Sequence, residues 1–176
     1  MNGATLIKGI WMKLYLILIF IISLLFGSDD RIIDIIVKNC SKNNNKICYQ
    51  SIRDYIDNDD VKIDWNLVKK LSINLCNNSY GDACQLLGNM YAPNSIKSIK
   101  KNWKISAKYH KKACELGNMV SCNNLGVLYK LGIFYKKNYK KALILFTKAC
   151  EDKDHPAVDK ACSNKDNVLS LLQQEN

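Results

Sequence analysis

The chain has 176 residues, of which 48% are hydrophobic and 24% are charged. This composition is typical of a globular protein and excludes a disordered chain. It contains only two prolines and eight glycines, which argues against a loop-rich all-β fold. The formal net charge is +10, and Arg31 and Arg53 are the only arginines among 26 positive residues. A chain this rich in lysine is expected to have solvated helix faces or acidic partners, and nucleic acid is a less suitable partner.

The N-terminal segment has the pattern of an export signal. Lys13 precedes a run of thirteen residues, Leu14–Phe26, that is apolar except for Ser23, and Gly27 and Ser28 follow it. A positive residue, a short apolar stretch and small residues at its end are typical of a cleaved signal peptide. An uncleaved membrane anchor is the alternative, but a spanning helix needs about 20 residues.

We therefore predict a signal peptide over residues 1–28 and a secreted or periplasmic domain over residues 29–176. Either Met1 or Met12 fits as the start of this signal. Its removal takes away two lysines and no acids, which leaves a net charge of 10 − 2 = +8.

Eight cysteines recur in pairs along the predicted domain. Three pairs are eight residues apart and the last is twelve apart: Cys40 and Cys48, Cys76 and Cys84, Cys114 and Cys122, Cys150 and Cys162. The leading cysteines follow one another at steps of 36, 38 and 36 residues. A period of about 37 residues is typical of helical hairpin arrays. We predict repeats over about 40–75, 76–113 and 114–149, and a C-terminal cap over 150–176.

The third repeat predicts two helices. Leu125, Gly126 and Tyr129 follow Cys122 at three, four and seven residues, which places them on one helix face. A second stripe with helical spacing predicts the partner helix: Tyr139, Ala142, Leu143, Phe146 and Cys150. We expect the glycine to let the two helices approach closely.

The difference in repeat length lies between Tyr91 and Trp103, where we expect the turn inside the second hairpin. Insertions are tolerated in such a turn. The segment between paired cysteines keeps its length in the first three repeats, whereas this turn does not.

Sequence-local pairing of the cysteines is the economical choice among the many connectivities that eight cysteines allow. Each bridge would tie the end of one repeat's second helix to the start of the next repeat's first helix, and would stabilise by about 2.5 kcal/mol. Zinc is the rival interpretation, but no Cys-x2-Cys pair occurs and the only histidines are His110 and His155. The Cys150–Cys162 pair is less secure, because four extra residues surround His155. Beyond it, residues 163–176 predict a capping helix.

Three segments carry a resemblance to a known family: Lys-Ala-Cys-Glu-Leu-Gly at 112–117, Ser-Cys-Asn-Asn-Leu-Gly-Val-Leu-Tyr at 121–129, and Tyr-Lys-Lys-Ala-Leu at 139–143. They resemble the Sel-like repeats and, more narrowly, the cysteine-rich secreted proteins of the Helicobacter type. The resemblance covers about 30–162 and is weak in the first repeat. It implies an all-α, tetratricopeptide-like superhelix of αα-hairpins, with one disulfide per repeat and a concave groove lined by the first helices.

The resemblance also implies two functions of different class. The Helicobacter-type proteins are commonly assigned as penicillin-binding proteins and β-lactamases, whereas the broader repeat group acts mainly as scaffolds for protein–protein contacts. The family label makes a β-lactamase the function to test, and a binding module for peptide, protein or cell-wall fragments is the alternative.

The residues themselves offer little for β-lactam chemistry. A serine β-lactamase needs Ser-x-x-Lys with further conserved elements, and the chain has one such match, from Ser98 to Lys101. This match lies in the variable turn and has no Lys-Thr-Gly element beside it, so we attribute it to chance. His110 aligns with Phe146 and predicts a packing position, and His155 next to Pro156 predicts a loop. We therefore name no catalytic residue, no metal site and no cofactor.

Four residues are candidates for the groove. If Cys122, Leu125, Gly126 and Tyr129 face the paired helix, Asn124 and Val127 point away from it. Their counterparts one repeat earlier are Leu86 and Asn89. An asparagine there could hydrogen-bond an extended peptide, because its amide both donates and accepts. The plainer interpretation is an exposed polar residue in an asparagine-rich chain.

We expect a monomer without a membrane span once the signal is removed, and no nucleic-acid partner. Lysines on the second helices predict solvent-facing stripes that could also draw carboxylates or phosphates; they lie at 100, 101, 104, 108, 111 and 112, and at 136, 137, 140 and 141.

Overall fold

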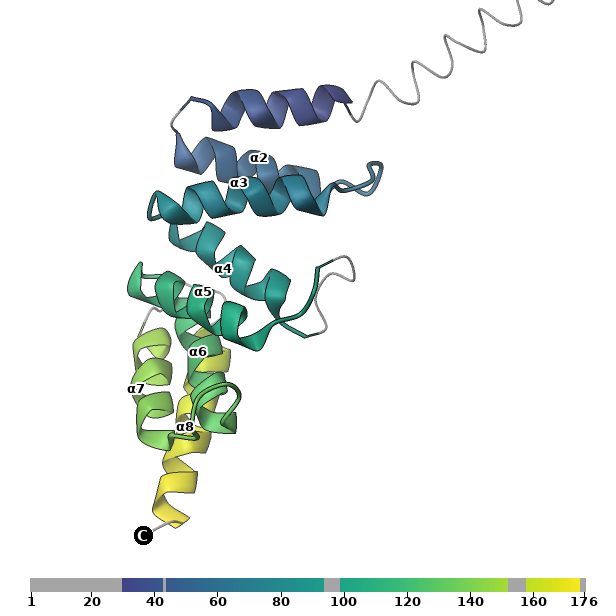
Figure 1. The fold of residues 1–176 in the computed structure, drawn as a ribbon. Helices are drawn as coiled ribbons and strands as arrows, with labels where there is room; N and C mark the ends of the chain where they lie inside the picture. The colour runs from purple at the N-terminus through teal and green to yellow at the C-terminus, as the bar shows by residue number, and fades with distance from the viewer. Residues whose placement is uncertain (1–29, 43, 94–98, 152–157, 175–176) are drawn as a thin grey trace, which may run out of the picture. The chain divides into compact units, whose positions relative to one another are not determined.

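The computed structural model describes residues 30–42, 44–93, 99–151 and 158–174. The proposed signal peptide lies outside these residues, as do Ser98 and His155. Every regular element within them is a helix, and the helices follow one another as hairpins (Figure 1). This confirms the prediction of an all-α hairpin repeat fold. The chain divides after Ile63 into two compact units, which are described separately.

The N-terminal unit contains a helix over residues 30–40 and α2 (Asn45–Ile56). The disulfide Cys40–Cys48 joins these helices at a Cα–Cα distance of 4.4 Å. Asn39 Nδ2 also donates a hydrogen bond to Ser51 Oγ at 2.9 Å. The side chain of Asn44 caps α2 by accepting from the Ile47 backbone N–H at 3.0 Å. The first predicted bridge thus lies at a helix–helix joint.

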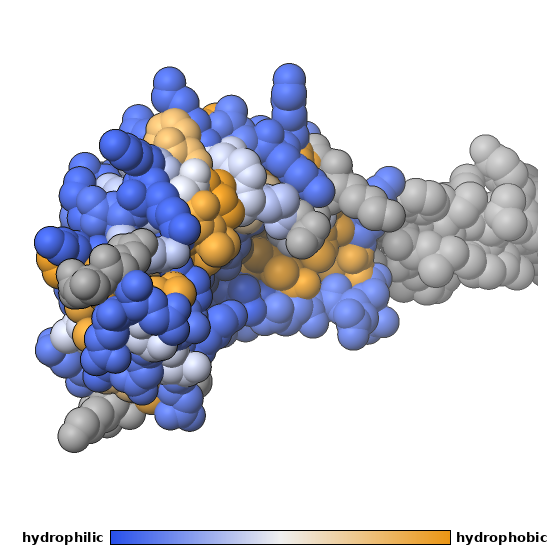
Figure 2. All heavy atoms as spheres, turned by 90° about the horizontal axis from the view of Figure 1, so that it is seen from below, coloured by the Kyte–Doolittle hydropathy of each residue, from blue (hydrophilic) through white to orange (hydrophobic). Residues whose placement is uncertain are grey.

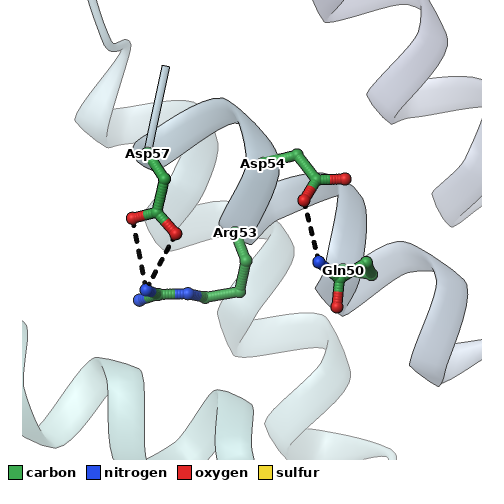
Figure 3. Close-up of polar contacts among 4 residues, drawn as sticks. All are labelled: Gln50, Arg53, Asp54 and Asp57. Atoms are coloured by element: carbon green, nitrogen blue, oxygen red, sulfur yellow. Dashed lines mark hydrogen bonds and ion pairs between the residues drawn. The ribbon is translucent and has the colours of Figure 1, made fainter. Parts of the chain in front are cut away.

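The charged side chains of α2 pair along the helix. Figure 3 shows Arg53 reaching Asp57 and Gln50 reaching Asp54. Arg53 Nη2 lies 3.0 Å from Asp57 Oδ2, and Gln50 Nε2 donates to Asp54 Oδ1 at 2.8 Å. Both contacts span four residues and are exposed to solvent. An exposed ion pair of this kind contributes about 0.3–0.5 kcal/mol. It supports the helix and does not form a site.

The described residues of the C-terminal unit form six helices: α3 (Trp65–Asn77), α4 (Gly81–Tyr91), α5 (Trp103–Glu115), α6 (Met119–Leu131), α7 (Tyr139–Cys150) and α8 (Val158–Gln174). Each helix packs against the next, and α4 also reaches α6. This pattern of neighbour contacts is typical of a repeat array. The last helix begins earlier than the capping helix expected at 163–176, because Ala161 is buried in one cluster with Ala149 and the Cys114–Cys122 pair.

An aromatic residue begins the second helix of each repeat. Trp65, Trp103 and Tyr139 are the first residues of α3, α5 and α7. The residue before each is an Asp or Asn whose side chain accepts a hydrogen bond from a backbone N–H of the first turn. Such caps satisfy donors that have no partner inside the helix.

The turns inside the second and third hairpins are closed by the same hydrogen bond. The backbone N–H of Asn102 donates to the carbonyl of Tyr91, and that of Asn138 donates to the carbonyl of Tyr129, both at 2.9 Å. The loops differ by two residues in length, yet their ends are joined alike. The length difference is therefore confined to the turn between Tyr91 and Trp103, as predicted.

Three disulfides join successive hairpins of this unit: Cys76–Cys84, Cys114–Cys122 and Cys150–Cys162. Their Cα–Cα distances are 4.8, 4.6 and 4.8 Å. Each runs from the end of a second helix into the next first helix. With the bridge in the N-terminal unit, this gives the one disulfide per repeat that the fold prediction contains.

Glycines allow the two helices of a hairpin to approach closely. A Cβ built on Gly126 in α6 would lie 2.6 Å from Cε1 of Phe146 in α7, and one built on Gly88 in α4 would lie 2.7 Å from the ring of His110 in α5. Contacts this short are not tolerated by a rigid ring. His110 and Phe146 therefore fill the same position in successive repeats.

Candidate binding groove

A cavity of about 310 Å³ lies among α4, α5, α6 and α8 of the C-terminal unit. Its lining is apolar with a few polar groups: Asn89, Ala92, Trp103, Ser106, His110, Asn123, Asn124, Val127, Leu128, Leu131, Ile133 and Lys160. A concave, mostly apolar surface with a few polar groups is the usual form of a binding site. Seen from the end at which α7 and α8 lie, the surface is mostly hydrophilic with several apolar patches (Figure 2).

Three of the four residues proposed from the sequence line this cavity: Asn89, Asn124 and Val127. Leu86 does not, and only 8% of it is exposed. It belongs to the buried face of α4, where an apolar side chain is removed from water. The repeat alignment equates Leu86 with Asn124, but the two positions carry side chains of different polarity and face different surroundings.

Hydrogen bonds between side chains hold the part of the groove formed by α6 and α8. Asn164 Nδ2 of α8 donates to Oδ1 of the buried Asn123 at 2.8 Å. Lys130 Nζ of α6 donates to Asn167 Oδ1 of α8 at 2.9 Å. The side-chain carbonyl of Asn123 therefore has a hydrogen-bond partner although the residue is buried. These contacts fix α8 beside α6 and make the last helix one wall of the groove.

His110 forms part of the inner wall and is 4% exposed. Burial lowers its pKa from 6.5 to about 4, because the charged imidazolium would lose its water. The side chain is therefore neutral at neutral pH. Its Nδ1 lies 3.3 Å from Oγ of Ser121. Nearby, the buried Ser106 hydroxyl donates to the Gly88 carbonyl at 2.8 Å.

Sequence reasoning missed the contribution of the second helix to this groove. It placed Trp103 only at the end of the variable turn and treated His110 as a packing residue, and it did not consider Ser106. The resemblance implies a groove lined by first helices only, and helical periodicity alone does not show which residues of α5 extend past α4 to the surface.

The arrangement has limited means for covalent chemistry. Ser121 and Ser106 are fully buried, and Ser121 does not line the cavity. Among the described residues, no group of three His, Cys, Asp or Glu side chains could hold a metal ion. In the same part of the chain, no helix is both long and apolar enough to cross a bilayer. The polar groups of the groove are three asparagine amides, the buried Ser106 hydroxyl, one neutral imidazole and Lys160, and all of them can make non-covalent contacts.

The fold and the groove define this chain as an αα-hairpin repeat protein in which disulfides join successive hairpins. Residues 81–118 and 120–154 match the Sel1 repeat family. This part of the chain therefore consists of Sel1 repeats, and the chain that carries them is rich in disulfide-bonded cysteines.

Two solved structures are similar to this chain. Cysteine-rich protein B of Helicobacter pylori is 27% identical, with a TM-score of 0.56 over 77% of this chain and 93% of that one. A Sel1 repeat protein from Oxalobacter formigenes has the same fold at 20% identity, with a TM-score of 0.63 over 75% of this chain and 95% of that one. No curated protein sequence matches the chain significantly.

Proposed function

We propose that this protein is an exported binding module whose groove holds an extended peptide segment of a partner protein or of the cell wall. The observation that carries the proposal is the joint lining of one cavity by Asn89 and Asn124, which come from successive repeats. An asparagine amide offers a donor and an acceptor, so two of them can bond an extended backbone at separate points. Sel1 repeats generally mediate protein interactions, which agrees with this role.

Export is supported by the cysteines. All eight are joined in disulfides, and such bonds persist in the periplasm and outside the cell but are rare in the cytosol. The signal-peptide pattern at residues 1–28 points the same way.

The apolar part of the lining gives the peptide side chains somewhere to bind. Val127, Leu131 and Trp103 border the cavity, and Leu131 is 56% exposed. Lys160 of α8 adds a positive charge at one wall. We therefore expect the preferred peptides to carry an apolar side chain and a carboxylate.

Hydrolysis of β-lactams is the second candidate, and one observation favours it. The Ser121 hydroxyl lies 3.3 Å from a His110 nitrogen, and a serine beside a neutral imidazole is the start of a nucleophilic site. However, Ser121 is fully buried, so a lactam carbonyl has no access to its oxygen. Among the described residues no carboxylate is hydrogen-bonded to His110, so the third member of a triad is also missing. We favour binding without turnover.

The experiment is a peptide array probed with the oxidised protein, followed by calorimetry on the peptides that bind. We expect Asn89→Ala and Asn124→Ala each to weaken binding roughly tenfold, because each removes one hydrogen-bonding amide. Asn74→Ala is the matched control: Asn74 is exposed on α3 and does not line the cavity. Equal losses in all three variants would refute a role for the groove.

The enzyme alternative is tested in parallel with a chromogenic cephalosporin. Turnover that copurifies with the protein and disappears in Ser121→Ala would establish hydrolysis and overturn the proposal of binding without turnover. We expect no turnover above that of the Ser121→Ala variant.

A further inference from the structure

A second cavity, of about 330 Å³, lies on the C-terminal unit between α5 and α7 and over α6. It is lined by Lys111, Cys114, Glu115, Leu125, Tyr129, Lys141, Ile144, Leu145 and Lys148. It shares no lining residue with the groove described above, so a role for this cavity is independent of the proposed function.

The floor of this cavity is apolar and well packed. Leu125 belongs to the buried core, and Tyr129 and Leu145 pack against it. The Cys114–Cys122 bridge lies beneath, in the adjoining core cluster. At the mouth, Ile144 is 69% exposed, so the cavity opens to solvent. Ile144 therefore extends the apolar surface of the floor toward solvent.

Three lysines and one glutamate surround the floor, which gives a net rim charge of 3 − 1 = +2. Glu115 forms only a long contact with Lys111, at 3.9 Å, and both side chains are more than half exposed. Within the described part of the chain, Lys141 and Lys148 have no carboxylate partner. The rim therefore attracts negative charge to the mouth of an apolar pocket.

Two of these lysines are held in place by the protein. Lys148 Nζ donates to the Cys114 carbonyl at the end of α5, at 3.1 Å, where a cation also complements the helix dipole. An ammonium group has three donors, so this bond leaves capacity for a ligand. Lys141 Nζ lies 5.4 Å from the centre of the Tyr129 ring, a cation–π distance. Positioned charges lose less entropy on binding than free ones do.

We propose that this α5–α7 pocket docks an acidic peptide segment of a partner protein, with one apolar side chain on the floor and carboxylates on Lys141 and Lys148. Its volume is near the lower end for ligand sites, about 300 Å³, which suits one side chain and not a long acyl chain. Nucleic acid fits less well, because Lys141 already lies over the face of Tyr129, where a base would stack.

The test is fluorescence anisotropy with a labelled peptide of sequence EELFEE on the oxidised full-length protein. Peptide EESSEE lacks the apolar anchor, and KKLFKK reverses the charge. We expect saturable binding of EELFEE alone, weakened by added salt because the ion pairs lie at the surface. No saturable binding of EELFEE, or equal binding of EESSEE, would overturn the proposal.

Two variants locate the site. Lys141→Glu replaces an attraction with a repulsion, so we expect a roughly tenfold loss of affinity. Ile144→Ser removes apolar contact from an exposed position and should weaken binding by roughly fivefold without unfolding the protein. Lys140→Glu is the matched control, because this exposed neighbour on α7 lies outside the pocket and makes the same change in net charge.

A membrane is the main competing occupant. Vesicles that contain phosphatidylglycerol are titrated in the same assay as competitors of the bound peptide. Displacement by vesicles that depends on Lys141 and Ile144 would assign the pocket to a lipid surface and overturn the peptide proposal. If Lys140→Glu and Lys141→Glu lose the same affinity for the peptide, net charge alone explains the loss, and this result would also overturn the peptide proposal.

Discussion

At the scale of single residues, the burial of His110 makes the stability of the fold sensitive to pH. The pKa of this imidazole is about 4 in the folded chain and 6.5 when it is exposed. Above pH 6.5 the side chain is neutral in both states. As the pH falls from 6.5 to about 4, the unfolded chain binds a proton that the folded chain does not, so the free energy of unfolding decreases. Below pH 4 both states are protonated and this loss stops.

We expect His110 to lower the free energy of unfolding by about 3 kcal/mol as the pH falls from 6.5 to about 4. Urea unfolding of the wild type and of His110→Phe, at several pH values between 4 and 6.5, isolates it. Phenylalanine is the natural replacement, because Phe146 fills the same position against Gly126 in the next repeat. The two proteins share every other titratable group, and the loss of the Ser121 contact in the variant costs the same at every pH. If the two proteins lose stability in parallel, the buried imidazole is not the cause.

Single residues also show how much of the structure could be predicted from the sequence. The alignment of His110 with Phe146 predicts a packing position, and the structure buries the side chain. It does not predict the depressed pKa, because that depends on contacts from outside α5. Gly88 of α4 lies under the ring, and Ser121 of α6 approaches Nδ1. Leu86 lies outside the cavity lining for a similar reason: repeat alignment carries over a position but not the surroundings of the side chain there.

At the scale of helices, the boundaries were predictable because each signal is local. A capping Asn or Asp next to an aromatic residue sets the start of α3, α5 and α7. The spacing of the cysteine pairs sets the joints between hairpins. The start of α8 was not predictable in this way, since it depends on the burial of Ala161 against Ala149 of α7. The pocket between α5 and α7 was not predictable either, because its lining residues come from three helices, α5, α6 and α7.

The contact between α6 and α7 gives a prediction at this scale. Gly126→Ala would force a methyl group to within 2.6 Å of the fully buried Phe146 ring. Overpacking of this kind costs about 1–3 kcal/mol, and the higher helix propensity of alanine returns about 1 kcal/mol. The ring is fully buried, so we expect an overpacking cost in the upper part of that range, about 2–3 kcal/mol, which leaves a net loss of about 1–2 kcal/mol in urea unfolding. Adding Phe146→Leu to Gly126→Ala should cost less than the sum of the two single changes, because the smaller side chain makes room. A Gly126→Ala protein as stable as the wild type would contradict the close approach.

At the scale of the whole molecule, the disulfides compensate for a thin core. A repeat array has no central core, because each hairpin contacts only its neighbours. The small core of the C-terminal unit includes disulfide sulfurs, since Cys114 and Cys122 are buried together with Ala149 and Ala161. Cross-linking at each joint restricts the unfolded chain where packing between repeats is limited.

The bridge Cys114–Cys122 joins the α4–α5 and α6–α7 hairpins, so its removal tests this argument directly. We expect Cys114→Ala with Cys122→Ala to lower the free energy of unfolding by about 2.5 kcal/mol, from the entropy of closing a short loop. For a chain of this size that corresponds to a fall in melting temperature of about 5–10 °C.

Reduction supplies the control, because the double variant also removes two buried sulfur atoms. In a strong reductant the wild type loses the same cross-link but keeps both sulfurs. Any difference that remains between the reduced proteins therefore measures packing alone. The cross-link argument requires a large gap between the oxidised proteins and a small gap between the reduced ones. If the gap is the same in both conditions, packing of the sulfurs and not the covalent bond stabilises the joint.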